Sequence, residues 1–245
     1  YGNLILNTIR THLAERIVYQ SHFSQGWWER VYGPTPVDCK VVYNAVDLAQ
    51  YTPEGPAERP VDRQRLLVVE GSLSGGYEVG LDSAVQMAEI LRRDYTQALE
   101  LMVVGKVSQA LQVAAQAKTQ VPLVFRGKIP GEQIPQVDRS AHLIFAAAPD
   151  AACPNSTIEA LACGLPVVAF DTGALPELVT AEAGMVVPYG GNPWELDPPD
   201  VMGLARGAAE VLADQPRFRQ GARRRAEEAF GLDLMVEGYL ACLLP

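Results

Sequence analysis

The sequence predicts an α/β fold built on a doubly wound parallel sheet. Short aliphatic runs recur along the chain, a stretch with helical spacing of apolar residues follows most of them, and Gly or Pro marks most of their ends. The runs are almost continuously apolar rather than alternating, which is typical of parallel strands covered on both faces. About 20–30 residues separate the starts of most successive runs, which is the length of a strand with its crossover helix.

Each element follows from this pattern in order. The expected strands of the sheet are residues 66–70, 99–104, 123–125, 143–146, 167–170 and 185–187. The expected helices are residues 81–92, 107–118, 156–163, 201–213, 216–230 and 232–243, and a short helix is expected to open within 171–177. Gly164 follows the third of these helices, where glycine favours the left-handed conformation that ends a helix.

The first 43 residues read as a separate small piece of α/β structure, with helices at 4–14 and 23–32 and strands at 16–20 and 40–43. The next twenty or so residues are rich in Pro and charge, as linkers are. The predicted parts are the tail of a second α/β domain (1–43), a linker (44–63), the main ligand-binding domain (64–230), and a C-terminal helix that packs back on the first part (231–245).

Composition excludes several classes of function. Hydrophobic residues make up 48% of the chain and charged residues 20%, which excludes wholesale disorder. The formal net charge of −9 argues against nucleic acid as the main partner, because phosphate backbones select basic surfaces. The longest clear apolar run, 143–148, is far shorter than the roughly 20 residues that cross a bilayer. With no signal-peptide pattern either, we expect a cytoplasmic protein.

Cysteine and histidine spacing gives no metal site. The chain has no C-x-x-C pair, and its three histidines do not recur at i, i+4. We expect the four scattered cysteines to be small buried hydrophobes. The sequence therefore predicts neither a bound metal nor a disulfide framework.

Three strand ends carry segments suited to a ligand, at the edge where parallel sheets bind ligands. Residues 70–77 are glycine-rich, so main-chain N–H groups can approach an anion. In residues 153–159, Asn155 or Ser156 can cap a helix whose Glu159 is placed to accept hydrogen bonds from ribose hydroxyls. Residues 171–177 open a short helix. Each segment also fits an ordinary turn, and Ser156 with Glu159 fits a capping box.

A resemblance covers nearly all of the main domain. The segment PNSTIEALACGLPVVAFDTGALPELV (154–179) closely resembles the nucleotide-sugar signature of family 4 glycosyltransferases, also called glycosyl transferases group 1. Earlier, AERIVYQSHFSQGWWERVYG resembles the last strand and helix of that family's N-terminal domain, and KVVYNAVDLAQYTP resembles its crossover between domains. The segments that resemble strands of its C-terminal domain are LELMVVGKVS, VFRGKIPGEQIPQVDRSAHLIF and AGMVVPYGG.

The resemblance implies a GT-B fold, in which two Rossmann-like domains face each other across a cleft. A nucleotide-diphospho-sugar donor of the UDP or GDP type binds mainly to the C-terminal domain. The acceptor hydroxyl binds mainly to the N-terminal domain, and this chain is expected to contain only the tail of that domain and to lack its acceptor-binding face. The implied activity is a hexosyltransferase that retains the configuration of the sugar and needs no metal or other cofactor.

Carried over position by position, the resemblance assigns donor-binding roles but no catalytic residue. Glu159 matches the carboxylate that holds the donor ribose, and Ile129 matches the main-chain contact to the base. The remaining donor-binding positions are the loop residues Gly71, Ser72, Gly75 and Gly76, the neighbouring Lys128, and the helix start at Asn155, Ser156 and Thr157, which would bind the diphosphate.

Departures from the family pattern define an alternative. Ala151, with Asp150 beside it, stands where the family has a Glu that contacts the donor sugar. Ser72 and the pair Tyr77-Glu78 stand where it has an Arg and a Lys for the diphosphate. Because a charge-assisted hydrogen bond contributes about 1.5–3 kcal/mol, these losses favour a catalytically impaired nucleotide-sugar-binding or regulatory module as the alternative. A GT-B epimerase or phosphorylase fits the signature less well.

Other charged and aromatic residues have plainer interpretations. Lys106 and Lys128 follow strands at the binding edge, where they can replace part of the missing charge or remain solvated. The basic run 223–225, together with Arg217 and Arg219, is expected to form a solvated helix face, with contact to an anionic membrane surface as the alternative. Trp27 and Trp28 are expected to pack in a core or against a missing domain rather than to stack on a ligand.

Overall fold

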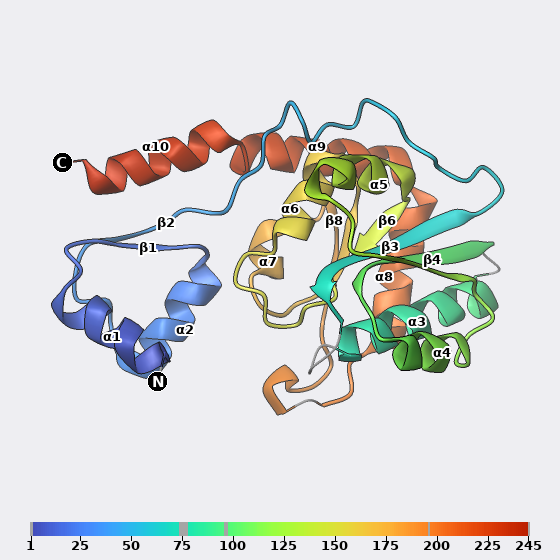
Figure 1. Cartoon of the computed structure of the whole chain (residues 1–245), viewed down its shortest axis with the longest axis horizontal. Coiled ribbons are helices and arrows are strands. Elements are labelled where there is room, and N and C mark those ends of the chain that lie inside the picture. Colours follow the sequence, from blue (N-terminus) through green and yellow to red (C-terminus); the bar gives the residue numbers. More distant parts are fainter. Residues whose placement is uncertain (1, 74–77, 96–97, 196, 245) are drawn as a thin grey trace.

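In the computed structural model of this protein, residues 2–73, 78–95, 98–195 and 197–244 are described. Their main feature is a six-stranded sheet with every pairing parallel, in the order β5-β4-β3-β6-β7-β8. The strands are β3 (Gln64–Ser72), β4 (Leu99–Lys106), β5 (Leu123–Gly127), β6 (Leu143–Phe145), β7 (Val167–Phe170) and β8 (Gly184–Val187). Helices lie on both sides of the sheet (Figure 1), so the predicted doubly wound α/β fold is confirmed.

Two groups of helices cover the two faces of this sheet. The first group is α3 (Glu78–Asp94), α4 (Gln109–Gln116) and α8 (Val201–Ala213). The second is α5 (Ile134–Ser140), α6 (Asn155–Ala162), α7 (Leu175–Leu178) and α9 (Gln215–Ala229). Leu66 and Val68 of β3 pack with the first group, whereas Leu67 between them packs with the second. Successive residues thus enter opposite halves of the core, which explains why the central part of each strand is apolar without alternation.

The sequence analysis missed α5. This helix follows a short 3-10 turn at Gly131–Gln133, and Pro135 lies in its first turn, a position that suits proline. Asp138, Arg139 and Ser140 of α5 are buried together with its apolar residues. Because these polar side chains take core positions, the apolar spacing that would have indicated a helix is absent.

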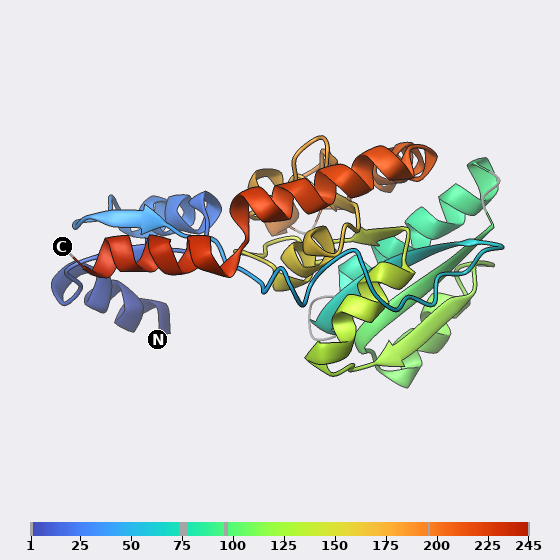
Figure 2. The same ribbon diagram turned by 90° about the horizontal axis from the view of Figure 1, so that it is seen from above.

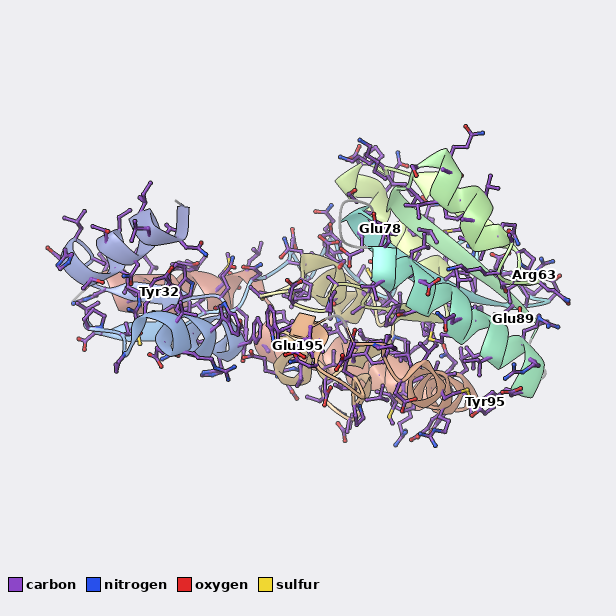
Figure 3. All side chains as sticks on the ribbon, turned by 90° about the horizontal axis from the view of Figure 1, so that it is seen from below. Tyr32, Arg63, Glu78, Glu89, Tyr95 and Glu195 are labelled. Carbon is purple, nitrogen blue, oxygen red and sulfur yellow. The ribbon has the colours of Figure 1, made fainter. Side chains whose placement is uncertain are left out.

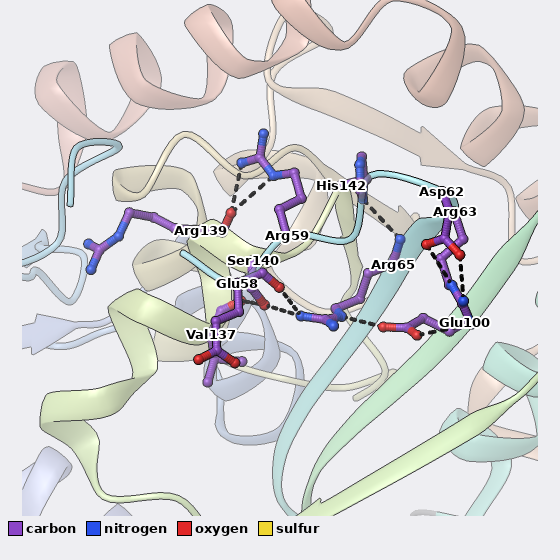
Figure 4. A network of polar contacts seen from close by, with 10 residues as sticks. All are labelled: Glu58, Arg59, Asp62, Arg63, Arg65, Glu100, Val137, Arg139, Ser140 and His142. Atoms are coloured by element: carbon purple, nitrogen blue, oxygen red, sulfur yellow. Dashed lines mark hydrogen bonds and ion pairs between the residues drawn. The ribbon is translucent and has the colours of Figure 1, made fainter. Parts of the chain in front are cut away.

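A polar network anchors the first residues of β3 (Figure 4). Arg65 Nε donates to Glu100 Oε1 at 2.6 Å, and Arg65 Nη1 donates to the Glu58 carbonyl and the Ser140 hydroxyl. The Arg65 main-chain N–H donates to His142 Nδ1 at 2.9 Å, which requires that nitrogen to carry no proton. Burial, together with nearby arginines, lowers the pKa of His142 to about 4, so the acceptor persists at neutral pH.

Arginines of α9 bind main-chain carbonyls, where the sequence analysis predicted a solvated basic face. The acceptors are Gly164 O for Arg219, Ala162 O and Tyr51 O for Arg223, and Leu178 O and Glu177 O for Arg225. Most of these carbonyls lie at the C-terminal ends of α6 and α7, where the helix dipole favours a cation. The prediction was wrong for these three arginines, while Arg217 and Arg224 are exposed and pair with acidic side chains.

Residues 2–43 form a small lobe at the other end of the molecule (Figures 1 and 2). It contains α1 (Gly2–His12), β1 (Ile17–Tyr19), α2 (His22–Tyr32) and β2 (Cys39–Val41), with β1 and β2 paired in parallel. The last helix, α10 (Leu232–Leu243), leaves the main sheet and lies beside these strands, where a Cβ at Gly238 would contact Val42 at 3.1 Å. The limits of the four predicted parts remain predictions.

Gly221 in α9 tests how closely this helix packs on the main domain. An added Cβ would lie 1.9 Å from the carbonyl oxygen of Glu182, so the helix would have to move. We predict that Gly221→Ala lowers the free energy of unfolding by about 1–3 kcal/mol, the usual effect of overpacking. Urea unfolding with a fluorescence readout measures the change.

Gly26→Ala is the matched control. Gly26 is interior to α2, and an added Cβ would meet no atom of the described residues within 4 Å. Alanine there is expected to raise stability by up to about 1 kcal/mol, because it restricts the unfolded chain and favours the helix. If both substitutions changed stability equally, the close packing at Gly221 would be wrong.

Candidate functional site

The carboxyl ends of β3 and β6 mark the candidate site. β3 pairs with both β4 and β6, but the chain leaves β3 towards β4 and reaches β6 only after β5. The loops after β3 and β6 therefore diverge, and doubly wound sheets bind ligands in the crevice that such loops leave. The described residues of the predicted donor site lie at this edge of the sheet: Gly71, Ser72, Lys128, Ile129, Asn155, Ser156, Thr157 and Glu159. Gly75 and Gly76 lie outside the described residues.

Helix α6 begins without a side-chain cap. Pro154 precedes its first residue, Asn155, and no side chain accepts a hydrogen bond at this end. The prediction that Asn155 or Ser156 caps the helix was therefore wrong, and so was the capping box of Ser156 with Glu159. The main-chain N–H groups of Asn155 and Ser156 have no acceptor within the described ranges. Two unpaired N–H groups at a helix start favour a bound anion.

Asn44 of the linker holds the loop before α6. Its Nδ2 donates to the carbonyl of Cys153 at 3.0 Å and to Oδ1 of Asn155 at 2.8 Å. The side chain of Asn155 is therefore engaged with the linker. Thr157 is buried, and its hydroxyl has no partner among the described residues. The start of α6 consequently offers its main chain, rather than these two side chains, to a ligand.

Glu159 lies in the second turn of α6 and is half-buried. Burial raises the pKa of its carboxyl, and a hydrogen bond with the side chain of Tyr51 opposes that increase. Burial and the charge of Glu159 also raise the pKa of Tyr51 to about 12, so the tyrosine hydroxyl keeps its proton and can donate. The side chain of Tyr51, in the linker, therefore helps to orient the carboxylate of Glu159.

Asp138 of α5 lies close enough to Glu159 for their charges to interact. Its side chain is fully buried, and neither carboxyl oxygen has a hydrogen-bond partner among the described residues. Burial, followed by the negative charge of Glu159, raises the pKa of Asp138 well above its usual range. Asp138 therefore holds its proton more tightly than an ordinary aspartic acid, and its protonated form does not repel Glu159.

Glu70 is a site residue that the sequence analysis did not single out. It follows the apolar core of β3 at the carboxyl edge, and its side chain accepts a hydrogen bond from the main-chain N–H of Ala148, in the loop after β6. Burial raises the pKa of Glu70 to about 7, and the hydrogen bond only partly opposes this increase. The signal available in the sequence was a charged residue directly after the apolar run 66–69.

The third predicted segment, 171–177, joins the two lobes. Glu177 of α7 accepts hydrogen bonds from the N–H groups of His22 and Phe23 at 2.9 and 2.8 Å, and from the Tyr43 hydroxyl at 3.0 Å. A carboxylate is favoured at a helix N-terminus, here that of α2. The segment is therefore more than an ordinary turn, because it fixes α2 beside the edge of the sheet.

Some features are absent from the described residues. They contain no cluster of three or more His, Cys, Asp or Glu side chains that could hold a metal ion. In the same part of the chain, no helix is long and apolar enough to cross a membrane. Cys153, Cys163 and Cys242 are buried free thiols, as expected, whereas Cys39 is exposed.

Comparison with known proteins assigns the chain to a family. The family model described as glycosyl transferases group 1 matches residues 64–214. This range contains the six-stranded sheet and the two elements that carry most of the candidate site, β3 and α6. The chain belongs to the glycosyl transferases group 1 family. Two curated relatives align with almost all of this chain, and the chain spans about half of their length.

Two curated relatives illustrate the family. The D-inositol 3-phosphate glycosyltransferase of Salinispora arenicola is 27% identical over 256 residues, which cover 93% of this chain and 54% of that protein. The alpha-maltose-1-phosphate synthase of Mycolicibacterium smegmatis is 32% identical over 146 residues, which cover 55% of this chain and 35% of that protein.

Solved structures show the same fold. Sucrose-phosphate synthase from Thermosynechococcus elongatus superposes with a TM-score of 0.78 at 19% identity, covering 97% of this chain and 60% of that one. Anabaena Alr3699/HepE, solved in complex with UDP and glucose, gives a TM-score of 0.72 at 18% identity, covering 98% and 66%. These superpositions confirm the predicted α/β fold of the GT-B type.

Glu70 makes stability depend on pH. Its carboxyl binds a proton more tightly in the folded chain than in the unfolded chain, so its contribution to stability falls as pH rises from about 4.5 through about 7. We predict that, relative to Glu70→Gln, the wild type loses about 1–3 kcal/mol of unfolding free energy between pH 5 and pH 8. Denaturant unfolding at four pH values measures this difference.

The control for this prediction is Glu132→Gln, because Glu132 is an exposed carboxylate in the 3-10 turn before α5. Its unfolding free energy is expected to follow that of the wild type at every pH. Parallel curves for the wild type and Glu70→Gln would contradict the burial of Glu70.

Proposed function

We propose that this chain is the donor-binding part of a retaining glycosyltransferase that uses a nucleotide-diphospho-sugar. The observation that carries the proposal is the start of α6, where unpaired N–H groups of Asn155 and Ser156 lie one turn from Glu159 in a chain of this family. The structure of Alr3699/HepE with UDP and glucose supports the same ligand class. In the complete protein, a hexose would pass to a hydroxyl acceptor.

The proposed site binds the diphosphate mainly through the main chain. The N–H groups at the start of α6 are fixed dipoles, which an anion meets without reorganisation. Glu159 accepts hydrogen bonds from the ribose hydroxyls, and the main chain of Ile129 contacts a uracil or guanine base. Lys106 and Lys128 are exposed at the same edge and supply positive charge for the leaving diphosphate. The reaction needs no metal in this proposal.

The structure also contains an observation that favours the alternative, a nucleotide-sugar-binding or regulatory module with impaired catalysis. The carbonyl of Ala151 accepts a hydrogen bond from Ala174 N–H at 2.9 Å, and a Cβ at Gly173 would lie 2.7 Å from that carbonyl. The loop is therefore held in place, and Asp150 stays exposed instead of replacing the missing Glu. Donor hydrolysis by the complete protein would favour the enzyme, and tight binding without turnover would favour the module.

A thermal-shift panel tests the ligand class. We predict that a UDP-sugar or a GDP-sugar raises the melting temperature of the 245-residue chain, since a ligand at 100 times its Kd adds about 2.7 kcal/mol of stability. ADP-glucose, pyrophosphate and glucose 1-phosphate are the comparison ligands. No shift with any nucleotide sugar would count against the proposal.

Glu159→Ala tests the ribose contact. Losing hydrogen bonds to a charged group costs about 1.5–3 kcal/mol, so donor affinity is expected to fall about 10- to 150-fold in titration calorimetry. Glu210→Ala is the matched control, because Glu210 is an exposed carboxylate on α8, which covers the opposite face of the sheet from α6. Equal donor affinity for both variants would remove Glu159 from the site.

A further inference from the structure

A second cleft lies between the small lobe and the main sheet. It has a volume of about 520 Å³ and is lined on one side by α2 and on the other by the turns that follow β6, β7 and β8. Figure 3 labels Glu195 on the segment after β8, which forms one wall, and Tyr32 at the far end of α2. None of the predicted donor-site residues lines this cleft.

Aromatic rings form one wall of the cleft. Trp27 of α2 stacks on Trp194 with ring centroids 4.4 Å apart and planes 12° apart. Phe23 lies parallel to Trp194 at 6.4 Å. Burial is incomplete, since Trp194 is 50% exposed and Trp27 is 37% exposed. Large rings left open to a concave surface offer an apolar face that a ligand can cover.

Polar groups face the same space. Thr172 is only 7% exposed, and its hydroxyl has no hydrogen-bond partner among the described residues. Buried hydroxyls are normally paired, and Thr172 is one of the residues that line the cleft. Arg30 lies 5.6 Å from the Trp27 ring, and its guanidinium makes no ion pair with any described residue. The carboxylate of Asp171 is engaged by the Tyr189 N–H at 2.8 Å.

This combination suits a hydroxylated six-membered ring. The C–H face of a sugar or cyclic polyol is apolar and covers an aromatic ring, while its hydroxyls need donors and acceptors at the edges. Thr172 and Asp171 supply both kinds of group, and Arg30 adds a cation for hydroxyls or for an anionic substituent. A purely apolar ligand would leave these groups unpaired, which costs affinity.

The cleft also lies beside the place where a donor sugar would react. Pro149 lines it, and the next residues are Asp150 and Ala151, the loop that the family resemblance assigns to the donor sugar. Gly173, another lining residue, packs directly against Ala151. A ring bound in this cleft would therefore lie beside the loop of Asp150 and Ala151.

We propose that the cleft between α2 and the turns after β7 and β8 binds the acceptor, a hydroxylated six-membered ring stacked against Trp194. The inference rests on the proposed function and names the acceptor class for it. In this inference, the lining residues of α2 and of the turns after β7 and β8 are the acceptor contacts that this chain supplies.

The test uses the 245-residue chain without any nucleotide, so that failure of donor binding does not affect the outcome. The probes are methyl α-D-glucopyranoside, myo-inositol and glucose 6-phosphate, with glycerol and inorganic phosphate as controls that lack the ring. Saturation-transfer NMR detects binding. Tryptophan fluorescence reports on the cleft, because two of the three tryptophans line it.

At least one ring probe is expected to bind with a Kd of about 1–10 mM, and the controls are expected not to bind. Trp194→Ala should weaken that binding about tenfold, and Trp194→Phe should restore it to within about threefold, because an aromatic face remains. Thr172→Val should weaken it about fivefold without lowering the melting temperature, since it removes an unpaired buried hydroxyl.

Three results would overturn the inference. They are no saturable binding of any ring probe at about ten times the expected Kd, equal binding of glycerol, or wild-type affinity in both Trp194→Ala and Thr172→Val. Because Thr172→Val is expected to keep the fold, a misfolded Trp194→Ala protein would still leave the inference testable. Ring binding without any nucleotide-sugar binding would support the cleft while contradicting the proposed function.

Discussion

The parallel pairing of β3 with both of its neighbours is the constraint on which the rest of the structure depends. Leu66 is in register with Leu101 of β4 and with Leu143 of β6, so the three strands end at one edge. Gly105 allows the close approach that this requires, since its φ is +136° and a Cβ there would lie 2.0 Å from the carbonyl of Glu70. The close contact of these strand ends places Glu70 at the crevice, where divergent loops leave room for a ligand.

The carboxyl edge of the sheet presents main-chain N–H dipoles and buried carboxyls with raised pKa values more than it presents cationic side chains. The chain carries a net charge of −9, yet Glu70 and Asp138 both have raised pKa values because they are buried. A carboxyl with a pKa near 7 is partly protonated at neutral pH, so it repels a bound diphosphate less than an ordinary carboxylate would. A bound anion would raise that pKa further, and donor binding would then take up a proton.

The sheet could be predicted from the sequence because its cause is local. Each strand is built on a short, mostly apolar run, which is the pattern expected of parallel strands buried on both faces. The start of α6 could not be predicted as closely, because Ser156 and Glu159 have the local chemistry of a capping box, yet Pro154 takes the position before the helix. The roles of Glu177 and Arg223 depend on partners far away in the chain, and no local pattern encodes such contacts.

Hydrogen bonds connect the small lobe and the linker to the carboxyl edge of the sheet at two points, so α2 and the candidate site hold each other in place. Asn44 binds the loop before α6, and Glu177 binds the first N–H groups of α2. Moving the lobe away would break hydrogen bonds to a carboxylate and expose the stacked face of Trp194. The start of α6 is therefore held partly by residues of the linker, so the position of the lobe and the geometry presented to a diphosphate depend on each other.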